Sequence, residues 1–142
     1  MIIRLKGEAG PVAINPWKVS IIGTVLAEGK LVGKPTPVLG QAGLFVPTQQ
    51  VTIQQGPEEI LEEFTRLLPV LYFLKCAVPG TPGGLWISPE HILAVSTPMD
   101  VGKPRIGEAA VLTPIGWVNV VGSPTTIMDR IDRTVLGYPQ ES

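Results

Sequence analysis

The sequence is poor in charge, cysteine and histidine. Charged residues make up 16% of its 142 residues, against about 25% in an average soluble domain. The single cysteine, Cys76, excludes an intrachain disulfide framework and a cysteine-rich zinc site. The single histidine, His91, excludes a zinc site built on several histidines. We therefore expect no metal and no cofactor.

Long apolar runs are also missing. The longest one, Leu67–Phe73, is far shorter than the ~20 residues that cross a bilayer. The first residues carry neither the apolar region nor the cleavage site of a signal peptide. We expect a protein that is not secreted and has no membrane partner.

The residues that are present are mostly apolar, with 44% hydrophobic residues, 16 glycines and 15 prolines. With so few charged residues, a small protein cannot cover its whole surface with polar groups. We therefore expect a protein partner or a homo-oligomer to bury apolar surface. A glycine- and proline-rich β core with uncharged polar loops is the alternative. The net charge is −1. Residues 1–69 carry six basic and six acidic residues, and residues 70–142 carry five basic and six acidic residues. Because neither half is basic, we do not expect a nucleic-acid partner.

The strongest pattern in the chain is an internal repeat. The stretch Val51–Phe64 resembles Val118–Ile131, since each has an alternating run, a small residue, a proline and an apolar helical stripe. Further matches keep the same order: Gly7 and Gly10 with Gly80 and Gly83, Ile14-Asn15-Pro16 with Ile87-Ser88-Pro89, Val32-Gly33-Lys34-Pro35 with Val101-Gly102-Lys103-Pro104, and Gly40–Pro47 with Gly107–Pro114. This conserved order indicates a tandem duplication.

Local patterns predict an α+β, mainly β fold with internal pseudo-symmetry. Alternating β-branched residues predict strands, and glycine–proline clusters predict the turns between them. Strands are expected at 1–6, 11–14, 17–27, 44–54 and 70–78, with a long loop at 28–43. Proline after a capping residue predicts helices over 57–68 and 124–134. The repeats, 1–69 and 70–142, each hold about four strands and one helix, packed together without a flexible linker.

No group of residues forms a convincing reactive site. The two Val-Gly-Lys-Pro loops lack the earlier glycine and the following serine or threonine of a phosphate-binding loop. A nucleophile pair of Cys76 and His91 has no local support, so we interpret Cys76 as buried and His91 as exposed. The cluster Glu58, Glu59, Glu62 and Glu63 lies opposite the apolar stripe of its helix, as a solvated face would. We expect no catalytic residues and no enzyme.

Tryptophans and the repeated loops are the candidate contact residues. Large aromatics often anchor interfaces, although core packing is the alternative for each of them. Lysine–proline pairs recur in the two glycine- and proline-rich loops, 28–43 and 96–108, whose order before binding the sequence leaves open. The candidate interface residues are Trp17, Lys34, Pro35, Trp86, Lys103, Pro104 and Trp117.

Each half resembles the small FlbD-like module, a family first known from flagellar operons. The resemblance lies in Val12-Ala13-Ile14-Asn15-Pro16 and in Val51–Ile60, and more loosely in Leu85–Pro89 and Val118–Ile127. It implies a β-rich, non-catalytic module. By type, the chain is also similar to small auxiliary proteins of phage particles.

We therefore predict a non-enzymatic structural or assembly protein, such as a phage capsid decoration or cement protein, bound to a repetitive protein surface in the virion. If the protein is not viral, we expect it in the cytoplasm. The alternative is a small regulatory module that binds a ligand or nucleic acid, with four candidate cationic contacts, Lys30, Lys34, Lys103 and Arg105.

Overall fold

The computed structural model describes residues 2–27 and 36–135. Up to residue 69 these ranges hold five strands, a 3₁₀ turn and a helix: β1 Ile3–Gly7, β2 Gly10–Ile14, η1 Pro16–Lys18, β3 Ile21–Ala27, β4 Thr36–Val46, β5 Gln49–Ile53 and α1 Pro57–Leu67. The later residues form β6 Leu74–Ala77, β7 Gly84–Ile87, η2 Pro89–His91, β8 Ala94–Ser96, β9 Met99–Asp100, β10 Lys103–Pro104, β11 Glu108–Thr113, β12 Gly116–Val121 and α2 Pro124–Val135. The described chain is thus mainly β, with two helices, as the sequence predicts.

Most of the described strands belong to one antiparallel sheet in the order β2-β1-β5-β4-β3-β7-β6. A smaller sheet has the order β12-β11-β8, and β9 pairs with β10. The pairing of β3 with β7 joins the two halves of the chain, with Ile21 opposite Ile87 and Ile22 opposite Trp86. The larger sheet therefore contains strands from both halves of the chain.

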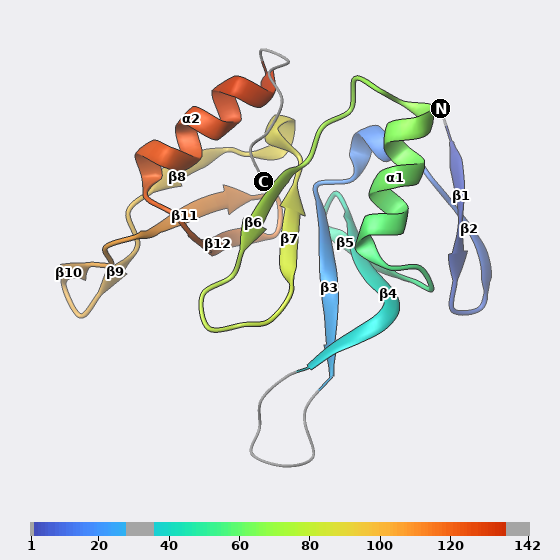
Figure 1. Ribbon diagram of the computed structural model, residues 1–142, viewed down its shortest axis with the longest axis horizontal. Helices are drawn as coiled ribbons and strands as arrows, with labels where there is room; N and C mark the ends of the chain where they lie inside the picture. Colours follow the sequence, from blue (N-terminus) through green and yellow to red (C-terminus); the bar gives the residue numbers. More distant parts are fainter. Residues whose placement is uncertain (1, 28–35, 136–142) are drawn as a thin grey trace.

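The strands β3 and β7 are buried on both faces. Successive side chains of a strand point to opposite faces, so Ile22 and Trp86 enter the core that includes Phe64 of α1. Their neighbours Ile21 and Ile87 enter a second core with Ile127 of α2. Figure 1 shows α1 beside β3 and over β4 and β5, and α2 beside β8 and β11. One pair of strands therefore forms the wall between two cores.

Both helices begin where the sequence predicts. Gly56 has an extended backbone at the N-cap of α1, followed by Pro57 and two glutamates in the first turn. At the start of α2 the hydroxyl of Ser123 accepts a hydrogen bond from the backbone N–H of Thr126 at 3.2 Å, which satisfies a donor that the helix leaves open. Within the described residues no helix is long and apolar enough to span a membrane.

Several strand boundaries differ from the predictions. Residues 36–43 belong to β4 and not to a loop, and the predicted strand 44–54 contains a turn between Val46 and Gln49. The predicted strand 17–27 begins with η1, and only Leu74–Ala77 of 70–78 is strand. Glycines and prolines produced the error at 36–43, because long-range pairing with β3 and β5 overrides their weak strand preference.

Candidate functional site

A short hairpin projects from the second half of the chain. Strands β9 and β10 pair Asp100 with Lys103 and Met99 with Pro104, and Figure 1 shows them extending away from the rest of the molecule. The turn residues Val101 and Gly102 both have positive φ, 50° and 76°, as a tight two-residue hairpin requires. Val101 is 95% exposed. The hairpin thus presents an apolar tip beside an exposed lysine, Lys103.

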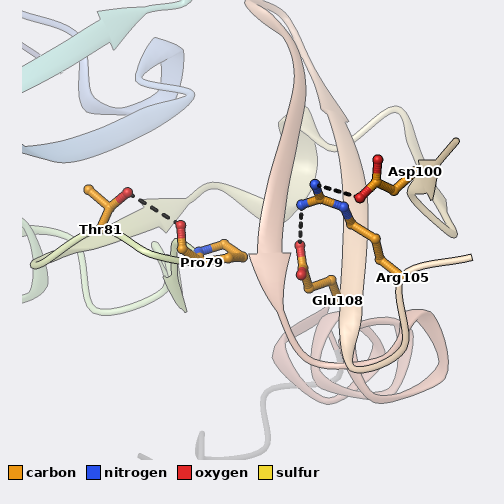
Figure 2. A network of polar contacts seen from close by, with 5 residues as sticks. All are labelled: Pro79, Thr81, Asp100, Arg105 and Glu108. Carbon is orange, nitrogen blue, oxygen red and sulfur yellow. Dashed lines mark hydrogen bonds and ion pairs between the residues drawn. The ribbon is translucent and has the colours of Figure 1, made fainter.

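Arg105 fastens the base of this hairpin to β11. Its backbone N–H donates to the carbonyl oxygen of Pro98 at 2.9 Å. Its guanidinium group lies 3.4 Å from a carboxylate oxygen of Asp100 and 3.5 Å from one of Glu108, as Figure 2 shows. Two carboxylates therefore offset the charge that the sequence suggests for an ionic contact. Arg105 positions the hairpin, and Lys103 forms no ion pair with any other described residue.

A groove of about 570 Å³ lies beside this anchor. Arg105 and Glu108 line one part of it, Trp117 and Asn119 of β12 another, and Val78 and Pro79 of the β6–β7 turn a third. Figure 2 shows this turn, with the hydroxyl of Thr81 3.4 Å from the carbonyl oxygen of Pro79. The groove combines an aromatic ring, an amide and a paired arginine.

The outer face of β12 supplies the groove with its largest side chain. Trp117 is 56% exposed, and Asn119 and Val121 on the same face are exposed as well, whereas Val120 is buried. The sequence did not single out Asn119. The period-two alternation of 116–121 is the signal that could have found it, because residues two apart share a face of a strand.

The other predicted contact residues have different surroundings. Trp86 is 7% exposed in the first core, with the ammonium group of Lys75 5.6 Å from the centre of its ring. Trp17 is half-buried and packs against the same core. Pro104 is exposed beside Lys103 in the hairpin, while Lys34 and Pro35 lie outside the described residues.

Cys76 and His91 have separate partners. Burial raises the pKa of the Cys76 thiol, and nearby Arg130 counters this increase. Partial burial lowers the pKa of His91, Glu90 raises it and Lys18 lowers it. The Nδ1 atom of His91 lies 3.0 Å from the hydroxyl of Ser88. Cys76 is thus a buried thiol near Arg130, and the imidazole of His91 contacts a hydroxyl of its own 3₁₀ turn.

The glutamates of α1 resemble a solvated face. Glu58, Glu59 and Glu62 are exposed, and Glu63 pairs with Arg66 of the same helix at 2.8 Å. Among the described residues no group of histidine, cysteine, aspartate and glutamate side chains could hold a metal ion.

Comparison with known proteins identifies the fold. The chain is similar in structure to a LytTr DNA-binding domain assigned to a methyl-accepting/DNA response regulator from Bacillus cereus, with a TM-score of 0.53. The two are 19% identical, and the match covers 96% of this chain and 97% of the other. No protein-family model matches the sequence, and no curated protein matches it.

This likeness corrects the sequence-based identification. The predicted FlbD-like module and phage decoration or cement protein are wrong, because the similar structure is a DNA-binding domain of a regulator. The virion location and the expectation of no nucleic-acid partner are wrong for the same reason. The virion prediction rested on the repeat, the low charge, the repeated loops and the lack of a reactive site, and the nucleic-acid prediction rested on the balanced charge of the two halves. The name of the similar domain gives DNA binding.

Proposed function

We propose that this protein is a non-enzymatic regulatory module that binds DNA. The observation that carries the proposal is the similarity to a DNA-binding domain over nearly the whole length of both chains. Such a role would place the protein in the cytoplasm, with the DNA.

The hairpin β9–β10 is the proposed element that enters a DNA groove. The major groove of duplex DNA admits a two-stranded β-ribbon, and this hairpin projects from the molecule. Lys103 lies next to its turn, where an ammonium group can reach a phosphate. The contacts of Arg105 with the carboxylates of Asp100 and Glu108 stabilise the base of the hairpin.

The groove beside the hairpin is the proposed source of sequence preference. The amide of Asn119 can both donate and accept hydrogen bonds, as base edges require. The exposed ring of Trp117 offers a large apolar contact. The candidate cations Lys30 and Lys34 lie outside the described residues and stay predicted contacts from the sequence alone.

We also propose that residues 1–69 and 70–142 arose by duplication. The order of elements supports this, because each half has two strands, a 3₁₀ turn, further strands and a terminal helix. Corresponding turns also have matching hydrogen bonds. The N–H of Lys18 donates to the carbonyl of Asn15 at 3.0 Å, and that of His91 to Ser88 at 3.0 Å.

Replacing Lys103 with alanine is expected to make DNA binding less sensitive to salt. Each neutralised phosphate contributes about 0.9 to the slope of log affinity against log salt concentration, so the slope should become shallower by about that amount. Fluorescence anisotropy of a labelled duplex of mixed sequence measures it. Lys18→Ala removes the same charge from the exposed end of η1 and is the matched control. No binding by the unaltered protein at low salt would refute the proposed function, and equal slopes for the two variants would exclude Lys103 as a phosphate contact.

Replacing Trp117 with alanine is expected to weaken DNA binding at constant salt. A central aromatic contact commonly contributes more than 1 kcal/mol, so the affinity should fall about tenfold or more. The same anisotropy titration measures this, and the salt slope should stay unchanged because no cation is removed. Tyr72→Ala removes another exposed aromatic, one that lines a hollow beside α1, and should bind normally. Equal affinities for both variants would place the DNA away from β12.

A further inference from the structure

Among the described residues, the larger sheet ends at β2 and β6, and the smaller sheet ends at β12 and β8. Strands β6 and β12 lie close to each other, so β2 and β8 are the edges considered for pairing. Strand β2 pairs only with β1, and β8 pairs only with β11. Figure 1 places β2 and β8 at opposite ends of the molecule. An unpaired edge exposes backbone N–H and C=O groups that another strand can bind.

The junction between the halves shows how such edges can pair. In it, β3 pairs with β7, and the backbone N–H of Ser88 donates to the carbonyl of Ser20 at 2.8 Å. The hydroxyl of Thr24 donates to the carbonyl of Gly84 at 3.3 Å. Gly83 makes this approach possible, since a Cβ on it would lie 2.8 Å from the hydroxyl oxygen of Thr24.

The free edge β8 has the local structure of β3. The N–H of Leu93, just before β8, donates to the carbonyl of Leu112 at 2.8 Å, and the N–H of Ser20, just before β3, donates to Phe45 at 2.8 Å. Counting 73 residues onward from Thr24 leads to Thr97. The hydroxyl group that β3 offers to the β7 side therefore has a counterpart in Thr97, directly after β8.

The free edge β2 likewise has the local structure of β7. Each strand ends at a 3₁₀ turn that begins with proline, and each begins near a glycine with positive φ, Gly10 at 132° and Gly83 at 84°. A Cβ on Gly10 would meet no atom within 4 Å. The space that Thr24 occupies beside Gly83 is thus vacant beside Gly10.

We propose that β8 of one molecule pairs with β2 of a second copy in the register of the β3–β7 junction. This register places Ala94 opposite Ile14, Val95 opposite Ala13, and Ser96 opposite Val12. The carbonyl of Leu93 accepts from the N–H of Asn15, and the hydroxyl of Thr97 donates to the carbonyl of Pro11.

The backbone of Ala13 is oriented for this pairing. The carbonyl of Lys6 accepts from the N–H of Gln54 on the β5 side, and the carbonyls of a strand alternate in direction. Lys6 and Arg4 therefore turn their polar groups away from β2, and their partners Pro11 and Ala13 turn theirs away from β1. Pro11 lacks an N–H at the outermost of these positions, as an edge strand tolerates.

Exposed apolar surface next to β8 also supports pairing with a second copy of the protein. Leu93 is 66% exposed, whereas Ser20, at the corresponding position before β3, is fully buried. Pairing with a second copy would cover Leu93. Because the two edges differ, the contact is head-to-tail and builds a ring or an open chain of molecules. The proposal does not depend on DNA binding and is tested without DNA.

Cysteine cross-linking tests the register. The double variant Val12→Cys with Ser96→Cys places two thiols opposite each other between molecules, at a spacing that suits a disulfide. After oxidation we expect disulfide-linked dimers and larger multimers on a non-reducing gel. The control, Glu8→Cys with Ser96→Cys, has an exposed thiol in the β1–β2 turn, outside the register, and both variants retain buried Cys76. Equal cross-linking of the two variants, or none in either, would overturn the proposal.

Sedimentation velocity tests the backbone contact. Ala13→Pro removes the outward N–H and leaves the hydrogen bonds between β1 and β2 in place, so self-association should weaken about tenfold. Thermal unfolding checks that the variant is folded, and if it is not, the cross-linking result decides. An unaltered protein that is monomeric at every concentration, or a folded variant that associates equally well, would refute the proposed contact. Neither result would alter the DNA titration, so the two proposals can fail separately.

Discussion

Replacing Phe64 with alanine is expected to lower the free energy of unfolding by about 3–5 kcal/mol, the usual cost of emptying a buried phenylalanine site. Phe64 is 1% exposed, and its ring centre lies 6.1 Å from that of Phe73. The ring fills the space between α1 and the first core, so its loss leaves a cavity that rigid strands cannot fill.

Urea denaturation followed by circular dichroism measures this loss. Thr65→Ala alters the next residue of α1, which is exposed, and should change stability by less than about 0.5 kcal/mol. A loss below about 1 kcal/mol in Phe64→Ala would show that the helix does not hold the first core together.

Replacing Gly83 with alanine is expected to destabilise the junction between the halves. The new Cβ would lie 2.8 Å from Cβ of Thr24, and relieving this overlap would disturb the Thr24–Gly84 hydrogen bonds. Overpacking of this kind costs about 1–3 kcal/mol, in addition to about 1 kcal/mol or more for a non-glycine residue at positive φ.

Gly80→Ala is the matched control, because Gly80 also has positive φ, 70°, and a Cβ there would meet no atom within 4 Å. Both variants share the cost of the backbone conformation, so the difference between their unfolding free energies isolates the contact with Thr24. Equal destabilisation of the two variants would show that the strands β3 and β7 can accommodate the extra methyl group without a loss of unfolding free energy.

The helices were predictable from sequence because their signals are local. Proline after a capping residue and apolar residues three or four apart placed them at 57–68 and 124–134, within one residue of Pro57–Leu67 and Pro124–Val135. The first strand was predictable from local preferences, since Ile2 and Ile3 favour strands and a turn follows at Gly7–Gly10.

The candidate site was only partly predictable. The sequence indicated Lys103, Pro104 and Trp117, and the structure places them on the hairpin and on the exposed face of β12. It could not indicate that two carboxylates surround Arg105, or that Trp86 is buried whereas Trp117 is exposed. These differences depend on which strands become neighbours.

The sequence by itself determined the composition of the cores, the two helices and the order of elements along the chain. Only the tertiary structure decided that β3 pairs with β7, that β2 and β8 lie at sheet edges, and that the β9–β10 hairpin projects from the molecule. The physical reason is the range of the interactions. A helix closes its hydrogen bonds within four residues, whereas a strand finds its partners only after distant segments have packed together.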